Sequence, residues 1–405
     1  MTKKVLWVSM RAPYDGVKHA GGKNHNYQVK GFAKNPCYDI TLITECFEEE
    51  TDIVKSECEN SNIKLYFTVN YKSGIKKYLR KLLNAESVLN PFNRYAGLTM
   101  NSLIYSIKRQ LNILTKNGYY PDIIILQWTQ VNLLAPFFKK RFPKSVLIEI
   151  EEDVAFLGYH RHFLLTKKSC VWKAKYNKLK KKELYSLGLA DLVVVNNVKD
   201  YNLLIDNEFK KDIFVLPPFY QRFDGIERRP AEKITMLFYG AMYRQENYRS
   251  VIWFIEKVCP LIDDIDYDFF VIGSNPPKDF FKFESSRIHI KGFVEDLTDF
   301  FSKVSFMVAP LILGAGIKIK VLEAFASGIP VITNTIGIEG IPATSGIDYM
   351  HAQSPEDYSN WIHKIDKGMV DLESMSSKEK TLVRDVFDYD KSLSELQERI
   401  LKMVN

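Results

Sequence analysis

Short apolar runs alternate with stretches of helical periodicity along the whole chain. In the first half, the runs that predict strands cover residues 4–10, 39–44, 122–127, 145–150, 191–196 and 213–217. A second series follows at residues 234–240, 268–273, 288–293, 305–311 and 330–334, with helical stretches at 248–262 and 296–304. Near-continuous Val, Ile and Leu runs are typical of strands buried on both faces of a parallel sheet. The pattern therefore predicts an α/β fold with two doubly wound domains.

The segment 217–233 separates the two series. It is rich in proline and charged residues, which is typical of a connection between domains. We therefore expect an N-terminal domain over residues 1–218 and a C-terminal domain over residues 219–387. The last residues, 388–405, predict an amphipathic helix with Leu393, Leu396 and Ile400 near helical spacing, and we expect it to pack back on the first domain.

Composition narrows the class of protein. The 405 residues are 46% hydrophobic, yet no apolar run reaches the length of a membrane span. The N-terminal residues predict a first strand rather than a secretory signal. The five cysteines are scattered and form no C-x-x-C pair, so we expect neither a disulfide framework nor a zinc site. A reduced, cytoplasmic protein without a metal or cofactor is the prediction.

Charge is distributed unevenly between the two halves. Residues 1–216 carry 34 lysines and arginines against 21 acids, and the remainder carries 22 against 28. A basic half favours an anionic partner, although ordinary solubility charge is the alternative. The basic stretches 72–83 and 167–183 contain interleaved apolar residues, which fits a peripheral surface on the inner face of an anionic membrane. The alternatives are that these lysines lie on solvated helix faces or that they bind nucleic acid. Because the sequence has no recognised nucleic-acid-binding motif, we expect no nucleic acid.

The segment GAGIKIKVLEAFASGIPVITNTIGIEG, residues 314–340, places two lysines where a helix should begin. The positive end of the helix dipole disfavours Lys318 and Lys320 there. Gly328 and Pro330 form a good helix stop, and the turn at residues 314–316 is small enough for a ligand to approach its N–H groups. A glycine-rich turn that leads into a helix is a ready phosphate site. The presence of two lysines at the start of this helix is explained if a phosphate or diphosphate binds at the turn.

An acid and a second glycine turn complete the candidate chemistry. Glu323 lies three residues after Lys320 on the same helix face, so the two form either a weak surface pair or part of a site. In a site, the Glu323 carboxylate can accept hydrogen bonds from the vicinal hydroxyls of a ribose. Gly21 and Gly22 follow the first strand without a G-x-G-x-x-G fingerprint, which argues against NAD. A simple flexible turn is the alternative there.

Residues 288–341 resemble the donor-binding half of retaining GT-B glycosyltransferases of the GT4 type, the glycosyl transferases of group 1. The matching stretches are Gly292-Phe293-Val294, Ala309-Pro310-Leu311, Gly314-Ala315-Gly316-Ile317-Lys318, Val321-Leu322-Glu323-Ala324, Gly328-Ile329-Pro330-Val331 and Gly337-Ile338-Glu339-Gly340. Residues 239–242 with Asn247, and Ala20-Gly21-Gly22, extend the resemblance.

The resemblance implies two Rossmann-like domains facing across a cleft, with a UDP- or GDP-sugar on the C-terminal domain. The implied reaction moves a hexose, without a metal, to a glycan or lipid-linked acceptor in the synthesis of a cell-surface polysaccharide. Lys318 and Glu323 are the implied catalytic residues, contacting the diphosphate and the ribose. The other implied donor-binding residues are Gly21, Gly22, Gly240, Asn247, Gly292, Phe293, Val294, Gly314, Gly316 and Ile317.

The chain departs from the family pattern at three places. The first acid of the E-x7-E motif falls on Ala315, the common arginine falls on Ala241, and the usual lysine falls near Glu246 or Asn247. Two alternatives therefore stay open. One is a sugar-nucleotide epimerase on the same fold, and the other is a non-catalytic homologue that binds or scaffolds.

Acceptor-site candidates follow the strand at 145–150. Glu152, Asp153 and His160 come after this strand, and ligands of open α/β sheets bind at the carboxyl ends of strands. A helix cap or an ordinary surface histidine is the alternative for each. Arg244 and Arg249 are further candidate cations for the donor phosphates.

Overall fold

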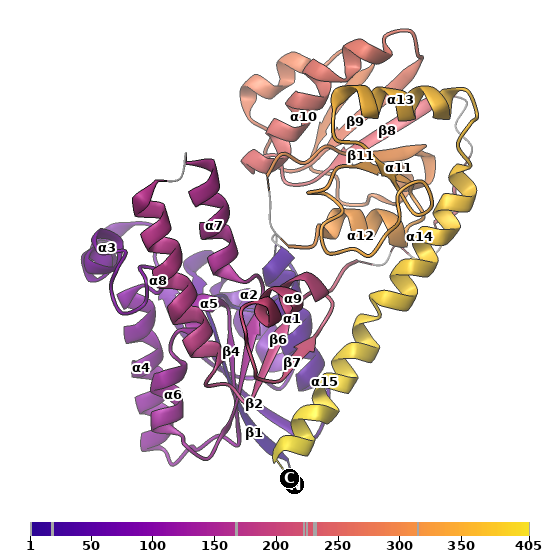
Figure 1. Ribbon diagram of the computed structural model, residues 1–405. Helices are drawn as coiled ribbons and strands as arrows, with labels where there is room; N and C mark the ends of the chain where they lie inside the picture. The colour runs from indigo at the N-terminus through magenta and orange to yellow at the C-terminus, as the bar shows by residue number, and fades with distance from the viewer. Residues whose placement is uncertain are drawn as a thin grey trace. The chain divides into compact units, whose positions relative to one another are not determined.

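Figure 1 shows the computed structural model, which describes residues 2–17, 20–166, 169–221, 223, 226–229, 233–313 and 316–404. The chain divides into two compact units. Unit 1 comprises Met1–Phe219 with Tyr389–Asn405, and unit 2 comprises Tyr220–Asp388. These boundaries lie one residue from the predicted ones. Each unit contains a parallel sheet flanked by helices, so the predicted fold class of two doubly wound α/β domains is confirmed.

The sheet of unit 1 has seven parallel strands in the order β3-β2-β1-β4-β5-β6-β7. Six of them match the predicted apolar runs. The strand that the sequence pattern missed, β3, lies at the sheet edge, and its side chains are mostly half-buried. The strands are β1 (Lys3–Ser9), β2 (Tyr38–Phe47), β3 (Lys64–Asn70), β4 (Ile123–Gln127), β5 (Val146–Glu151), β6 (Leu192–Val195) and β7 (Ile213–Val215).

Helices cover both faces of this sheet because successive strand residues point to opposite faces. Val5 and Trp7 of β1 pack with α1, α2 and α15, whereas Leu6 and Val8 pack with α4 and α6. The helices are α1 (Ala20–Ala33), η1 (Glu48–Glu50), α2 (Thr51–Asn60), α3 (Gly74–Leu89), α4 (Asn101–Lys116), α5 (Thr129–Asn132), α6 (Ala135–Arg141), α7 (Ala155–Leu165), α8 (Cys170–Leu187), α9 (Val198–Asp206) and α15 (Tyr389–Val404).

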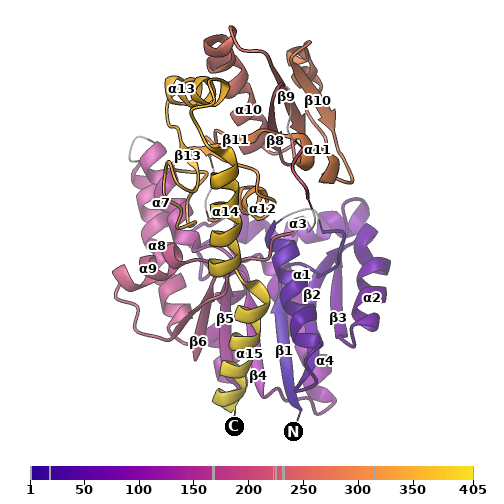
Figure 2. The ribbon, with the colours of Figure 1, turned by 90° about the vertical axis from the view of Figure 1, so that its right-hand side faces the viewer.

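Helix α15 returns to unit 1 at the end of the chain and lies beside α1 (Figure 2). Leu393, Leu396 and Ile400 belong to the same buried cluster as the β1 residues. Polar contacts add to this packing: the Tyr38 hydroxyl donates to the carbonyl of Gln397 over 2.6 Å. The apolar face of the predicted terminal helix therefore completes the core of unit 1.

The sheet of unit 2 has six parallel strands in the order β10-β9-β8-β11-β12-β13 over one continuous core. The helix predicted at 248–262 begins earlier, at Gln245, and ends at Lys257, because Pro260 lies in a separate 3₁₀ turn. The elements are β8 (Ile234–Tyr239), α10 (Gln245–Lys257), η2 (Cys259–Ile262), β9 (Tyr267–Ile272), η3 (Lys278–Phe283), β10 (Ile288–Gly292), α11 (Thr298–Lys303), β11 (Phe306–Ala309), α12 (Ile319–Ala326), β12 (Val331–Thr333), β13 (Met350–His351), α13 (Pro355–Asp366) and α14 (Leu372–Val386).

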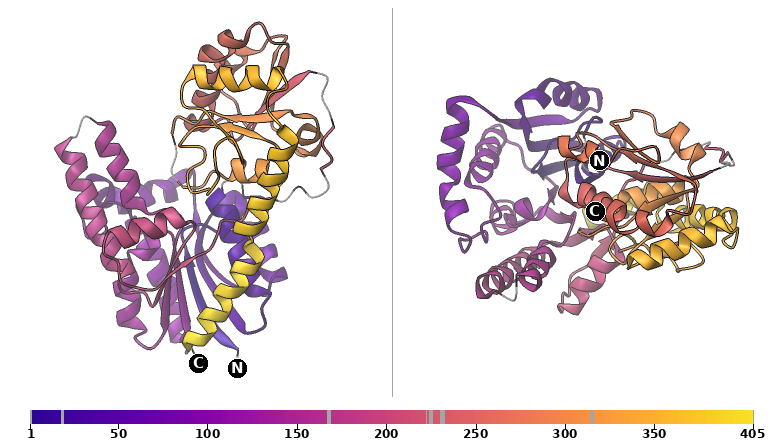
Figure 3. Two further views of the ribbon diagram at one scale, coloured as in Figure 1. Left: turned by 45° about the vertical axis from the view of Figure 1, so that its right-hand side comes forward. Right: turned by 90° about the horizontal axis from the view of Figure 1, so that it is seen from above.

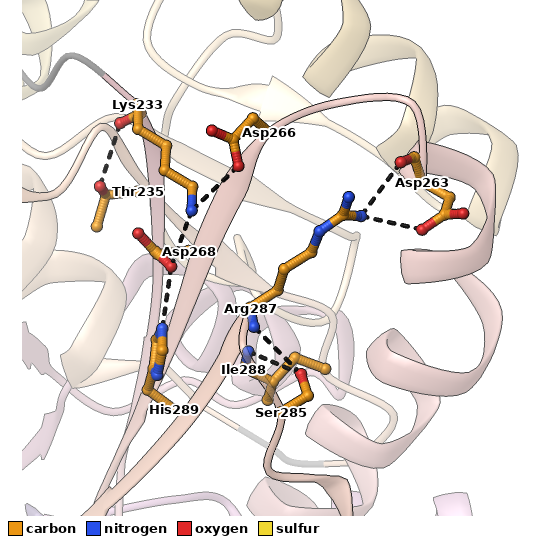
Figure 4. Close-up of polar contacts among 9 residues, drawn as sticks. All are labelled: Lys233, Thr235, Asp263, Asp266, Asp268, Ser285, Arg287, Ile288 and His289. Carbon is orange, nitrogen blue, oxygen red and sulfur yellow. Dashed lines mark hydrogen bonds and ion pairs between the residues drawn. The ribbon is translucent and has the colours of Figure 1, made fainter.

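Charged residues connect the amino-terminal ends of β8, β9 and β10 (Figure 4). Lys233 lies 3.1 Å from Asp266 and 3.2 Å from Asp268, and His289 donates to Asp268 over 2.9 Å. This end of the sheet is therefore occupied by mutual ion pairs.

Within the described part of the chain, no helix is both long enough and apolar enough to span a bilayer.

Candidate functional site

The strand order of unit 2 places a switch point between β8 and β11. From these two central strands the chain proceeds outward in opposite directions, to β9 and β10 on one side and to β12 and β13 on the other. Open α/β sheets bind ligands at the carboxyl ends of the strands beside such a point. The predicted segment at 240–247 follows β8 directly, and the one at 316–323 lies between β11 and β12. The topology therefore brings together the two segments that the sequence motifs indicated.

Glu323 lies on α12 and is only 8% exposed. The Tyr239 hydroxyl donates to its Oε2 over 2.7 Å, and the N–H of Gln221 donates to its Oε1 over 3.3 Å. Burial, together with the Glu323 carboxylate, raises the pKa of Tyr239 well above its ordinary value, so the phenol keeps its proton and stays a donor. These two donors anchor the Glu323 carboxylate, a group that can accept about four hydrogen bonds.

The side-chain ammonium of Lys320 is the unusual cation of this site. Its Nζ donates to Oδ1 of Asn247 over 2.7 Å and lies 4.3 Å from the ring centre of Phe238. Burial of the side chain, and to a smaller extent repulsion from Arg244, lowers the pKa of Lys320 to about 7. An anion bound beside the ammonium would counter both effects and hold the lysine charged.

Gly240 makes the space in which the Lys320 ammonium lies. Its φ of +151° is a conformation that residues with a Cβ rarely adopt. A Cβ at this position would lie 2.7 Å from Nζ of Lys320 and 3.0 Å from Nδ2 of Asn247. The Asn247 amide in turn donates to the carbonyl of Ala241 over 2.8 Å. The strand-end glycine, the asparagine and the lysine therefore form one packed group.

Lys318 lies where the sequence predicted the start of a helix. It is the N-cap residue of α12, one residue before the helix begins. Its Nζ donates to the carbonyl of Gly316 and lies 3.6 Å from Oε2 of Glu339. The Lys318 charge therefore has a carboxylate within ion-pair distance.

The remaining predicted donor residues occupy varied environments. Gly292 ends β10, Phe293 is 73% exposed, and Val294 packs against the core of unit 2. Gly316 is buried and Ile317 packs against the same core. Gly314 and Ala315, which carry the start of the phosphate turn and the altered E-x7-E position, lie outside the described residues.

The glycine turn at 337–340, at the end of the motif, is held against the strand ends. A Cβ on Gly337 would lie 1.8 Å from Oγ1 of Thr333 and 3.2 Å from the carbonyl of Ala309. Thr333 itself donates to that carbonyl over 2.7 Å. Gly337 therefore allows close packing of the turn on β11 and β12, which is a structural reason for a glycine there.

Unit 1 has a corresponding switch point between β1 and β4, and a cluster of polar side chains lies there. Gln127, the last residue of β4, is at its centre. The Gln127 Nε2 donates to Gln28 over 2.7 Å and to Oε1 of Glu152 over 2.6 Å. Its Oε1 accepts from the Trp7 indole over 3.0 Å and lies 2.5 Å from Nδ1 of His25.

Glu152 accepts hydrogen bonds from three side-chain amides in this cluster. Beside Gln127, Asn24 donates to its Oε2 over 2.9 Å and Asn196 over 3.0 Å. Burial raises the pKa of Glu152, and the three amides oppose that shift. The predicted acceptor candidate is thus part of an organised network that four elements build.

Trp128 follows Gln127 with a φ of +73°, a strained conformation for a residue with a Cβ. Its ring lies 4.9 Å from that of His25. A Cβ on Gly21 would lie 3.7 Å from the Trp128 indole nitrogen and 3.9 Å from Oε2 of Glu152. Gly21 and Gly22 belong to the first turn of α1, so their predicted place in a loop is wrong.

The other predicted polar residues do not join this cluster. Asp153 is exposed just before α7. His160 lies in the hairpin of α7 and α8 (Figure 3), where its ring packs 4.9 Å from that of Tyr176. In unit 2, Arg244 pairs with Glu246, and Arg249 is exposed on α10.

Several members of the two clusters were not predicted from the sequence. Tyr239 in unit 2 and Trp128 in unit 1 had no assigned role. Lys320 was expected near a phosphate together with Lys318, but it was not among the implied donor-binding residues. Asn24, Gln127 and Asn196 are polar residues on separate elements, and no local pattern connects them.

A known protein family and a curated relative match parts of this chain. Residues 233–367 match the family model of glycosyl transferases group 1. A protein of the cps region of Klebsiella pneumoniae, itself described as uncharacterized, is 22% identical over 194 residues, which cover 45% of this chain and 48% of that protein. The matched part therefore spans about half the length of this relative.

Solved structures match over nearly the whole chain at low identity. A glycosyltransferase from Rickettsia africae has a TM-score of 0.63 at 13% identity and covers 100% of this chain and 99% of its own. Sucrose-phosphate synthase from Thermosynechococcus elongatus has a TM-score of 0.69 at 12% identity, covering 99% of both chains. Anabaena HepE in complex with UDP has a TM-score of 0.63 at 11% identity, covering 98% and 100%.

These similarities define the class of protein: the two doubly wound units have the GT-B fold. Within that class, the resemblance to glycosyl transferases of group 1 is confirmed, and the family match covers the strands and helices that carry Lys320 and Glu323.

Proposed function

We propose that the chain is a retaining glycosyltransferase that moves a sugar from a nucleotide-diphosphate sugar to a glycan or lipid-linked acceptor in the synthesis of a cell-surface polysaccharide. The observation that carries the proposal is the group formed by Gly240, Asn247 and Lys320 beside the buried Glu323 at the β8/β11 switch point. The group places a cation and an anchored carboxylate at the ends of two adjacent strands. A nucleotide sugar presents diphosphate and ribose hydroxyls with matching chemistry.

In this proposal the diphosphate lies beside Lys320, and Lys318 adds positive charge near the start of α12. The N–H groups at the start of this helix contribute the positive end of its dipole. Glu323 accepts hydrogen bonds from the ribose while Tyr239 holds it in place. The usual family lysine falls near Glu246 or Asn247 in this chain, and the ammonium that contacts Asn247 comes from α12 instead.

The transfer itself requires charge stabilisation more than acid or base groups. The bond between the anomeric carbon and the diphosphate oxygen breaks, and the acceptor oxygen bonds to the same face of that carbon. The acceptor proton passes to the departing diphosphate oxygen. Negative charge therefore develops on the diphosphate, where preorganised cations are most effective. Because lysines of the chain supply this charge, we propose that the reaction needs no metal ion.

The acceptor is proposed to bind unit 1 at the cluster of Gln127, Trp128 and Glu152. An indole and several amides suit a sugar, which presents both apolar ring faces and hydroxyl groups. The strained backbone of Trp128 is typical of residues held in position for a function.

The proposal is tested by following sugar transfer directly. The parent chain is incubated with UDP-glucose or GDP-mannose, with and without a lipid-linked glycan fraction, and both nucleotide release and product anomers are measured. Acceptor-dependent release with a retained anomeric configuration supports the proposal, with EDTA as a test of the metal. Conversion of the donor to another sugar nucleotide without acceptor would indicate an epimerase. Nucleotide binding without turnover would indicate a scaffold, which the replacement at Ala315 keeps as an alternative.

A further inference from the structure

Helix α3 (Gly74–Leu89) exposes the face that a surface helix normally buries. Ile75, Tyr78, Leu79 and Leu82 follow the i, i+3, i+4, i+7 spacing of an apolar stripe. They are 79%, 66%, 55% and 72% exposed. Among the described residues, the hydrophobic clusters of unit 1 include no side chain of α3. The stripe therefore has no partner within unit 1.

The opposite face of α3 attaches the helix to unit 1 through polar contacts. Arg80 donates to both oxygens of Glu45 on β2, over 3.1 and 2.6 Å. Asn84 and Ser87 accept hydrogen bonds, over 2.9 and 3.2 Å, from backbone N–H groups at the start of α4. Residues 80, 84 and 87 lie on one helix face, and α3 contacts α4 at the outside of the unit (Figure 1). The helix is thus docked with its polar side inward and its apolar side outward.

A basic cavity lies next to the apolar stripe. It measures about 460 Å³ and is lined by Asn70, Tyr71, Lys72, Lys77, Arg80, Lys81 and Asn84. Lys72 pairs with Glu49, and Arg80 pairs with Glu45. Across the described chain, neither Lys77 nor Lys81 has a carboxylate within ion-pair distance. The cavity therefore combines uncompensated positive charge with a tyrosine hydroxyl and amides, which suits a phosphate group.

We propose that α3 docks unit 1 on an anionic lipid bilayer. Its apolar stripe enters the boundary between headgroups and acyl chains, and the basic cavity beside it receives a lipid phosphate. Exposed apolar residues with lysines beside them are the pattern of an interfacial helix, and the charge of the cavity selects anionic lipid. A second copy of this chain would bring the same lysines together, and charge complementarity therefore favours the bilayer. The inference goes beyond the proposed sugar transfer and does not depend on the donor.

The second basic stretch, at 167–183, lacks the features that support α3. Lys167 and Lys168 lie outside the described residues, and the helix that follows, α8, buries Leu179 and Leu187 in a core cluster. Of its lysines, Lys173 and Lys181 are exposed and the others are half-buried. The two stretches look alike in composition, but α3 is the one that exposes an apolar stripe at i, i+3, i+4, i+7 spacing.

Vesicle flotation with the full chain tests this proposal. The vesicles contain either phosphatidylcholine alone or phosphatidylcholine with one third phosphatidylglycerol. One variant, Leu79→Gln/Leu82→Gln, removes apolar area, and another, Lys77→Gln/Lys81→Gln, removes charge from the cavity. The control, Val171→Gln/Tyr185→Gln, changes two exposed residues of α8. Circular dichroism and thermal melting confirm that each variant is folded.

The parent and the control should bind the anionic vesicles and bind neutral vesicles weakly. The apolar variant should bind at least about tenfold more weakly, since two leucines no longer enter the bilayer. The charge variant should lose about 30-fold at low salt, because each lysine near an anionic surface contributes to binding. The proposal would be overturned if the parent chain does not bind anionic vesicles, or if the Leu79→Gln/Leu82→Gln variant binds them as the parent does. A parent dimer that the apolar variant loses would also overturn it, because the stripe would then be covered by a second copy.

Discussion

Replacing Lys320 by methionine removes the cation at the β8/β11 switch point while it keeps an unbranched side chain of similar length. In the folded chain this ammonium contacts Asn247 and the face of Phe238, beside Gly240. Methionine still fills that space and can pack against the ring. We therefore expect the fold to persist and the change to act on binding of the donor diphosphate.

The size of the effect follows from the charge and its pKa. A hydrogen bond to a charged group contributes about 1.5–3 kcal/mol, so Lys320→Met should weaken binding of the donor about 10- to 150-fold. The pKa of Lys320 is lowered to about 7, chiefly by burial. A diphosphate binds the protonated amine, so affinity is full below that pKa and falls as the pH rises above it. Between pH 6 and pH 8 the protonated fraction, and with it the affinity of the parent, should fall about tenfold.

Isothermal titration with UDP-glucose and GDP-mannose at pH 6, 7 and 8 measures both effects. The diphosphate of these donors is esterified at both ends and does not titrate over this range, so a pH dependence reports on the protein. Lys291→Met, at an exposed position on β10 of the same unit, is the matched control. The control should keep the affinity and the pH dependence of the parent, and Lys320→Met should lose both. If Lys320→Met binds as the parent does at pH 6, the assignment of the cation is wrong.

Three further changes have defined outcomes. Tyr239→Phe removes the hydrogen bond to Glu323 and should weaken donor binding about fivefold in the same titration. Burial and the nearby Glu183 raise the pKa of Glu149 well above its ordinary value, so its contribution to stability is complete at low pH and is lost as the pH rises through that raised pKa. In urea unfolding, Glu149→Gln should therefore reduce the fall in stability between about pH 5 and pH 9, by up to about 1.4 kcal/mol per pH unit. Leu396→Ala should lower the free energy of unfolding by about 2–5 kcal/mol, whereas Lys402→Ala on the exposed side of α15 should leave it unchanged. Equal losses in the two α15 variants would contradict the packing of this helix on unit 1.

The elements that could be predicted from the sequence are those whose burial gives a recognisable pattern of apolar residues. Central strands such as β4 and β6 are buried on both faces and read as apolar runs. The edge strand β3 is mostly half-buried, and β13 has two residues, so neither gives such a run. The C-terminal helix was evident because its core-facing leucines recur at helical spacing.

The candidate sites were predictable only where the motif is local. Glu323 and the glycines around it lie within one short segment and share a recognisable pattern. Lys318 and Lys320 are two residues apart, and only the packing of α12 against β8 shows that Lys320 is the one beside Asn247 and Phe238. Likewise, the cluster at Gln127 unites α1, β4 and the ends of β5 and β6, and a contact across four elements has no signature along the chain.

The central claim is that unit 2 binds a nucleotide-diphosphate sugar at Glu323 and Lys320. A thermal-shift panel of UDP, GDP, CMP, ADP and NAD, run on the parent and on Glu323→Ala, tests it most directly. The account predicts that one nucleoside diphosphate stabilises the parent selectively and that Glu323→Ala loses this shift. The same shift in both proteins, or no shift with any nucleotide, would contradict the claim.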